Sequence, residues 1–87
     1  MDYYKVLWKR SSEKDLRNIE PKQIPRIIKV AESLSENPFP RQNRKLRGSK
    51  DNYRIRVGNY RVIYQVDKRM KIVTIYHICH RREIYRK

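Results

Sequence analysis

The stretch YRIRVGNYRVIYQV, residues 53–66, decides the fold of this chain, because its pattern is that of a β-hairpin. Valine, isoleucine and tyrosine, which favour strands, fill most positions on both sides of Gly58-Asn59. A glycine–asparagine pair between two such runs is typical of a two-residue hairpin turn. Two antiparallel strands are therefore predicted at 53–57 and 60–66.

Side-chain alternation along these two strands separates an apolar face from a basic face. The apolar set is Tyr53, Ile55, Val57, Tyr60, Val62, Tyr64 and Val66. Arg54, Arg56 and Arg61 point the opposite way. The helices of the domain have to cover the apolar set, so we expect the three arginines to share the uncovered face of a rigid sheet.

The segments before the hairpin predict one strand and two helices. Aromatic and β-branched residues predict a strand at 3–8. A short helix is predicted at 11–19, where Ser12 and Asp15 have the spacing of a capping box. Apolar residues at helical spacing predict an amphipathic helix over 24–34.

The remaining segments complete one small domain. A basic loop is predicted at 39–52, with a short strand at 45–47, and a last strand at 71–79. The order β-α-α-β-β-β, with helices first and a meander of strands after them, is typical of an α+β fold. We therefore expect a single domain over 1–87, an antiparallel sheet with two helices packed on one face.

Positive charge is concentrated in the second half of the chain. The net charge is +14; residues 1–40 contribute eight Lys/Arg against six Asp/Glu, a net of +2. Residues 41–87 contribute fifteen against three, a net of +12. Such asymmetry favours a polyanionic partner: nucleic acid, an acidic membrane surface or an acidic protein. A merely solubilising surface is less favoured, because self-repulsion destabilises the compact state.

The composition disfavours membrane and secreted proteins. No apolar run approaches the roughly 20 residues of a spanning helix, and MDYYKVLWKR at the start lacks the apolar region of an export signal. The single cysteine, Cys79, allows no internal disulfide and suits a reducing compartment. We therefore expect a cytoplasmic protein without a membrane segment.

The sequence favours neither a metal nor another cofactor. HICH offers soft ligands, but on a strand His77 and Cys79 point to one side and His80 to the other. The second half has three acidic residues, and no two of them adjoin. Without an acidic pair to hold magnesium, any phosphodiester chemistry is expected to be metal-free.

Arginines on a rigid sheet face suit phosphate binding. The guanidinium fork matches phosphate oxygens, so it can position a nucleic acid or stabilise charge that develops during cleavage. Metal-free cleavage favours RNA, whose own 2′-hydroxyl can attack the adjacent phosphate in line. His80 suits proton transfer, and Tyr85 suits stacking on a base. The alternatives are arginines that cover apolar surface, a backbone-bonded His80 and a tail packed through Tyr85.

Other basic residues of the loop and of the C-terminal tail are candidates for contacts with RNA. They are Arg44, Lys45, Arg47, Lys50, Arg82 and Arg86.

Four segments resemble the RelE branch of the RelE/ParE superfamily of toxin–antitoxin toxins. They are KLRGSKDNYRIRVGNYRVIYQV, HRREIYRK, the earlier YKVLWKRSSEKDL, and ENPFP after the second helix. The resemblance implies the same small fold. It also implies an endoribonuclease, an mRNA interferase, that enters the ribosomal A site and cuts mRNA by 2′-hydroxyl attack without a metal, thereby inhibiting translation.

The family's functional positions fall on Arg54, Arg56, Arg61, Arg81 and Tyr85. The first two are commonly lysine in the family, and arginine cannot replace lysine as a base. The resemblance therefore implies that both bind phosphate and stabilise charge, with His80 or Tyr85 as the candidate base. Arg61 would bind the scissile phosphate, and Arg81 would assist the leaving 5′-oxygen or hold the phosphate.

The resemblance also implies partners. A cognate RelB-like antitoxin, helical and acidic or amphipathic, would silence the toxin, and the ribosome and mRNA would be its targets. We expect a monomer alone and a heterotetramer or larger complex with the antitoxin. A ParE-like inhibitor of DNA gyrase and a non-catalytic RNA-binding module are the alternative functions.

Overall fold

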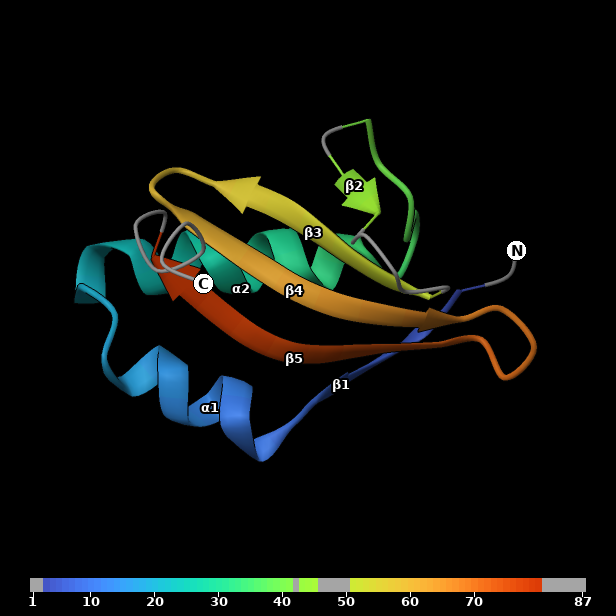
Figure 1. Cartoon of the computed structure of the whole chain (residues 1–87), viewed down its shortest axis with the longest axis horizontal. Coiled ribbons are helices and arrows are strands. Elements are labelled where there is room, and N and C mark those ends of the chain that lie inside the picture. The colour runs from blue at the N-terminus through green and yellow to red at the C-terminus, as the bar shows by residue number, and fades with distance from the viewer. Residues whose placement is uncertain (1–2, 42, 46–50, 81–87) are drawn as a thin grey trace.

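The computed structural model describes residues 3–41, 43–45 and 51–80 and shows a five-stranded sheet with two α-helices (Figure 1). The elements are β1 (Lys5–Trp8), α1 (Arg10–Arg17), the 3₁₀ turn η1 (Pro21–Gln23), α2 (Ile24–Ser33), β2 (Asn43–Lys45), β3 (Asn52–Val57), β4 (Tyr60–Asp67) and β5 (Ile72–His80). Their spatial order in the sheet is β1-β5-β4-β3-β2. The α+β class and the hairpin are confirmed. The short strand predicted at 45–47 overlaps β2 only at Lys45, because β2 begins at Asn43, and residues 46–47 lie outside the described residues.

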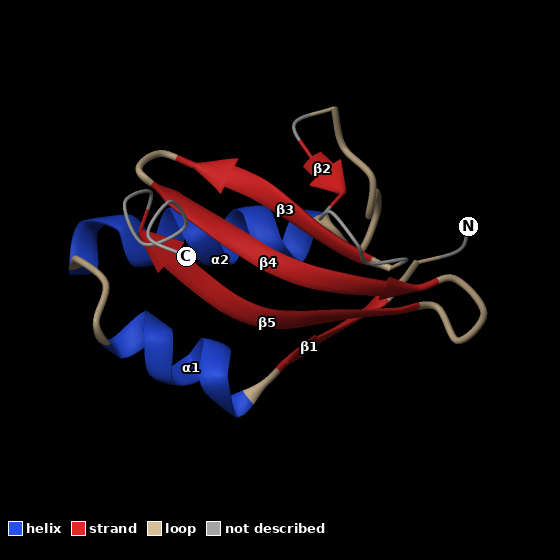
Figure 2. Ribbon diagram, viewed as in Figure 1, coloured by secondary structure: helices blue, strands red, loops and turns tan. Residues whose placement is uncertain are grey.

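The hydrophobic core lies on one face of the sheet, as the alternation predicts. The buried members from the strands are Ile55, Val57, Val62, Tyr64, Val66, Val73, Ile75 and Ile78. Helix α2, which lies behind β3 and β4 in Figure 2, contributes Ile27 and Ala31, followed by Leu34 at its C-cap. No helix in the described part of the chain is long and apolar enough to cross a membrane.

The sheet is mixed, because β1 pairs with β5 in parallel, from Lys5 opposite Ile72 to Trp8 opposite Ile75. The other three pairs are antiparallel, as expected. The two helices connect β1, at one edge of the sheet, to β2, at the other edge. As an edge strand, β1 runs in the same direction as its neighbour β5. The pattern of 3–8 predicts a strand but carries no information on its partner.

A β-bulge shifts the alternation of β5. Ile63 is opposite His77 but Tyr64 is opposite Ile75, so Tyr76 has no partner of its own in β4. An extra residue of this kind shifts the alternation of side chains between the two faces of the sheet by one position. Ile75 and Ile78 therefore both reach the core, although they are three positions apart.

The predicted capping box at Ser12 and Asp15 is wrong. Helix α1 begins earlier, and its N-cap residue Lys9 makes no side-chain cap. The Ser12 hydroxyl donates instead to the Lys9 carbonyl over 2.6 Å. Asp15 accepts a hydrogen bond of 2.9 Å from the backbone N–H of Ile78 in β5, so its carboxylate serves a tertiary contact.

Candidate functional site

Four arginines from three adjacent strands form an arginine cluster on the face of the sheet opposite the core. Its members are Arg44, Arg54, Arg56 and Arg61. Arg44 of β2 is directly opposite Arg54 of β3, and Arg56 of β3 is directly opposite Arg61 of β4. Directly opposed residues point to the same face, with their Cβ atoms about 5 Å apart. The structure thus confirms that the three hairpin arginines share a face, and it adds Arg44.

This pairing of like charges is unfavourable by itself. Like charges directly opposite each other on a sheet destabilise it. Among the described residues, Arg56 Nε donates to the Gly58 carbonyl over 3.1 Å, and Arg44 donates to the carbonyls of Arg41 and Asn43. These neutral carbonyls orient the guanidinium groups of Arg56 and Arg44 but do not cancel their charge. An anionic ligand with several phosphates would relieve the repulsion.

His80 does not lie with the arginine cluster. It is opposite Tyr60 at the end of the sheet, on the face that carries the core, and the two rings make an edge contact with centroids 5.3 Å apart. With Asp15, Asn18, Ile19 and Ile78 they line a hollow of about 320 Å³ next to α1. The geometry therefore gives His80 no direct access to a phosphate held by Arg61.

The predicted RNA-binding residues of the loop divide between the two faces. Lys45 is opposite Tyr53, which belongs to the apolar set, so it points away from Arg44. It lines a separate hollow with Asp51, Asp67, Lys68 and other residues at the far end of the hairpin. The other proposed positions, Arg47, Lys50, Arg81, Arg82, Tyr85 and Arg86, lie outside the described residues.

His77, which the sequence analysis considered only as a metal ligand, lies on the face of the arginine cluster. It is opposite Ile63, and Ile63 is opposite Arg54, so the residues form one row across β5, β4 and β3. The signal was present in the sequence: Ile78 is apolar, so its neighbours His77 and Cys79 have to point away from the core. Within the described residues, no three His, Cys, Asp or Glu side chains group as a metal site would require.

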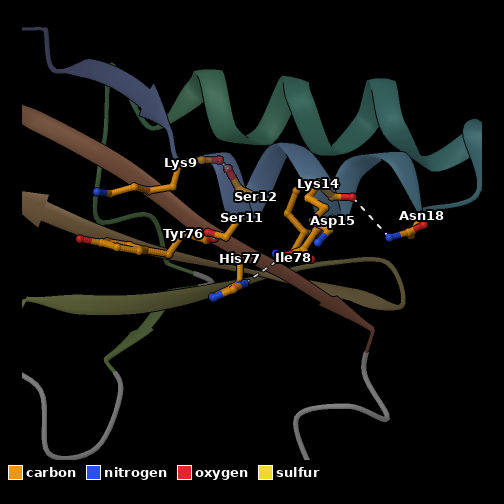
Figure 3. A network of polar contacts seen from close by, with 9 residues as sticks. All are labelled: Lys9, Ser11, Ser12, Lys14, Asp15, Asn18, Tyr76, His77 and Ile78. Atoms are coloured by element: carbon orange, nitrogen blue, oxygen red, sulfur yellow. Dashed lines mark hydrogen bonds and ion pairs between the residues drawn. The ribbon is translucent and has the colours of Figure 1, made fainter.

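Helix α1 fixes His77 through a polar network along the free edge of β5 (Figure 3). Ser11 Oγ donates to the Tyr76 carbonyl over 2.6 Å. The Asp15 carboxylate bonds His77 Nδ1 at 3.1 Å as well as the Ile78 N–H at 2.9 Å. These contacts begin where the pairing of β1 with β5 ends, so α1 supplies partners that a neighbouring strand would otherwise provide.

Tyr76 adds an aromatic ring to the same face. Its hydroxyl donates to Gln65 Oε1 over 3.0 Å, and Gln65 lies on the open face of β4. The Lys9 ammonium lies 5.6 Å from the centre of the ring. Cations and an aromatic ring on one open surface are typical of sites that hold single-stranded nucleic acid.

A buried tyrosine holds β2, and with it Arg44, against the sheet. The Tyr64 hydroxyl donates to the Pro38 carbonyl over 2.8 Å and accepts from Asn43 Nδ2 over 3.2 Å. Burial raises the pKa of Tyr64 to about 12, and the Asn43 hydrogen bond opposes that change. The neutral phenol is therefore the form that anchors this end of the arginine cluster.

Comparison with known proteins identifies relatives along most of the chain. Residues 6–85 match the family described as ParE toxin of the type II toxin–antitoxin system parDE. The chain is 34% identical over 85 residues to the toxin RelE3 of Methanocaldococcus jannaschii, covering 93% of this chain and 94% of that protein.

Comparison with solved structures also identifies proteins of toxin–antitoxin complexes. The archaeal RelE–RelB complex from Pyrococcus horikoshii contains a chain with a TM-score of 0.80 and 31% identity, over 93% of this chain and 97% of that one. The toxin–antitoxin complex RelBE2 from Mycobacterium tuberculosis gives a TM-score of 0.80 and 27% identity, over 91% and 99%.

Proposed function

The chain belongs to the RelE/ParE superfamily as a RelE-type toxin of type II toxin–antitoxin systems, and from that premise we propose that it is a metal-free mRNA endoribonuclease acting in the ribosomal A site. The observation that carries the proposal is the double pairing of like charges, Arg44 with Arg54 and Arg56 with Arg61, on the open face. A toxin that acts only through apolar protein contacts has no use for such an arrangement.

The proposed chemistry follows from what arginine can and cannot do. Arginine stays charged, so Arg54 and Arg56 hold phosphates and stabilise the charge that develops on the attacked phosphorus. Arg61, half-buried in the central strand β4, binds the scissile phosphate. The 2′-hydroxyl of the substrate supplies the nucleophile, so the protein has to orient the backbone and move protons. Arg81 would assist the leaving 5′-oxygen or hold the phosphate, and Tyr85 would stack on a base.

We propose a RelB-like antitoxin as the regulatory partner. Similar chains are found in complexes with RelB in the structures from P. horikoshii and M. tuberculosis. The net charge of +14 suits an acidic antitoxin, whose carboxylates would pair with the arginine cluster and block access of RNA. The ribosome and mRNA are the proposed targets, which places the action of the toxin in the cytoplasm.

The first test is mRNA cleavage on programmed ribosomes. We expect ribosome-dependent cuts by the wild type and a rate about 10²- to 10³-fold lower for Arg61→Gln, because one charge-stabilising group at the reacting phosphate is lost. Lys29→Gln is the matched control: it removes the same charge from an exposed position on α2, behind the sheet, and should cleave at the wild-type rate. Equal rates for all three proteins would contradict the proposed role of the cluster.

A ParE-like inhibitor of DNA gyrase is the second candidate, because the matching family carries the ParE name. It predicts growth arrest with intact mRNA and inhibited supercoiling by gyrase. Cleavage that requires Arg61 would exclude it as the main activity. RNA binding without either effect would leave a non-catalytic binding module.

A further inference from the structure

His77 and Asp15 form a hydrogen-bonded pair whose geometry is that of an oriented base. His77 Nδ1 lies 3.1 Å from Asp15 Oδ2, and the same oxygen accepts the Ile78 N–H over 2.9 Å. A carboxylate oxygen accepts hydrogen bonds, and this one also accepts the Ile78 N–H, so we assign the proton of the contact to Nδ1. The lone pair of the neutral imidazole is then on Nε2, the nitrogen that Asp15 does not contact. The His77 side chain is 54% exposed, so a ligand can approach the imidazole from solvent.

The register of the sheet places this imidazole next to the arginine cluster. Arg61 is opposite Cys79, and His77 is two residues before Cys79, so Arg61 and His77 are diagonal neighbours on adjacent strands. Such neighbours lie about 7–8 Å apart, which long side chains can bridge. A phosphate bound by Arg61 would therefore have the adjacent ribose within reach of His77.

We propose that His77 is the general base of the RNA cleavage reaction and that Asp15 is the residue that positions it. This inference rests on the proposed endoribonuclease function and names the group that arginines at 54 and 56 cannot provide. It replaces His80, which lies on the other face of the sheet beside Tyr60.

The proposed step is balanced in atoms and charge. His77 Nε2 takes the proton of the 2′-hydroxyl while the 2′-oxygen bonds to phosphorus. The bond from phosphorus to the 5′-oxygen breaks, and that oxygen keeps the electron pair and takes a proton from solvent. The imidazolium returns its proton to solvent. The products are a 2′,3′-cyclic phosphate and a 5′-hydroxyl, and no co-reactant is consumed.

The charged neighbours of His77 come from several elements. Asp15 approaches from α1, Arg61 from β4, and Arg54 and Arg44 lie farther along its row in β3 and β2. Asp15 would stabilise the imidazolium that forms, as a carboxylate does behind a catalytic histidine. A purely structural role, in which the pair only ties α1 to β5, is the competing explanation, because Ser11 makes a tie of that kind nearby.

His77→Asn separates the two explanations, because an asparagine amide can still donate to Asp15 but cannot accept the proton. We expect single-turnover cleavage on programmed ribosomes to slow about 100-fold or more, with binding of RNA lacking the reactive 2′-hydroxyl unchanged. Asp15→Asn should slow cleavage about tenfold or more. Ser11→Ala removes the other tie between α1 and β5 and should change the rate less than twofold.

The pH profile is the second readout. Removal of a general base should change how the cleavage rate depends on pH, so the profiles of the wild type and of His77→Asn should differ in shape. An unchanged profile in His77→Asn, or equal losses in His77→Asn and Ser11→Ala, would overturn the assignment. Loss of cleavage in His80→Asn but not in His77→Asn would return the role to His80.

The proposed function and this inference fail in distinguishable ways. Cleavage by the wild type that requires Arg61 but not His77 would overturn the inference alone. Absence of ribosome-dependent cleavage by the wild type would overturn both. A urea unfolding curve for each variant separates a lost base from a lost fold.

Discussion

Tyr64 shows how one buried side chain determines where a basic residue lies. Its hydroxyl contacts Pro38 in the segment after α2 and Asn43 at the start of β2. Asn43 directly precedes Arg44, so the phenol fixes the outermost member of the arginine cluster. The ring also stacks on Tyr53, its directly opposed residue in β3, with centroids 5.8 Å apart.

The pKa of Tyr64 predicts a loss of stability in alkali. Burial raises this pKa from 10.0 to about 12, so the unfolded chain ionises the phenol before the folded chain does. The folded state consequently binds more protons between pH 10 and 12. The stabilisation is complete below pH 10 and is lost as the pH rises toward 12. Urea unfolding followed by circular dichroism over this range measures the loss.

Tyr64→Phe provides the comparison. It should be less stable at pH 7, by about 1 kcal/mol, because the buried Pro38 carbonyl loses its donor. Between pH 10 and 12, however, its stability should fall less steeply than that of the wild type. Parallel curves in that range would show that another group causes the alkaline transition.

The β3–β4 hairpin depends on the conformation of a single turn residue. Gly58 has φ +61°, a region in which L-residues are disfavoured. A Cβ at this position would meet only ordinary contacts, at 3.6 Å from Arg26 and Gln23. The cost of a substitution would therefore arise from the backbone rather than from a collision.

We predict that Gly58→Ala lowers the free energy of unfolding by about 1–2 kcal/mol. Asn59→Ala, in the same turn, is the control and should change it by less than about 0.5 kcal/mol. Equilibrium urea unfolding of the three proteins tests this. Similar values for the two variants would mean that side-chain contacts, not backbone strain, determine the stability of the turn.

The free edge of β5 is covered by a helix instead of a strand. Beyond the last pair with β1, Ser11 and Asp15 satisfy the Tyr76 carbonyl and the Ile78 N–H. Exposed edges invite association with other chains, and covering them with polar side chains prevents it. Helix α1 also orients His77 through Asp15. The same helix therefore covers the edge of the sheet and holds the proposed base in position.

At the scale of the molecule, charge and apolar surface are separated by the sheet. The core and α2 lie on one face, and the arginine cluster and His77 lie on the other. Among the residues that the structure describes, the second face therefore combines several phosphate-binding groups with a proton acceptor. A polyanion should bind there through contacts whose strength falls as counterions compete.

The salt dependence of RNA binding tests this separation. For a single-stranded oligonucleotide, the slope of log affinity against log salt should lose about 0.7 per phosphate contact removed. We expect that change for Arg54→Gln, whereas Lys29→Gln, with the same change in net charge, should leave the slope unaltered. Fluorescence anisotropy across a potassium chloride series measures both. Equal slopes for both variants would indicate a diffuse attraction without a defined face.

Local patterns in the sequence determined the fold class, the hairpin, the helices and the shared face of Arg54, Arg56 and Arg61. These features depend on periodicity and turn residues within short segments, where side-chain alternation leaves few alternatives. From the sequence, His80 is proposed as a candidate base and His77 is considered only as a metal ligand. Alternation separates the two histidines, but the register with β4 is needed to decide which of them joins Arg61.

Only the tertiary structure decided the parallel partner of β1, the bulge at Tyr76 and the pairing of Asp15 with His77, which are 62 residues apart. Each of these results from satisfying backbone groups or burying apolar ones across distant segments, and no local pattern specifies the partner. Asp15 illustrates the reason: its spacing from Ser12 suggests a helix cap, but the unpaired Ile78 N–H at the edge of β5 binds its carboxylate instead.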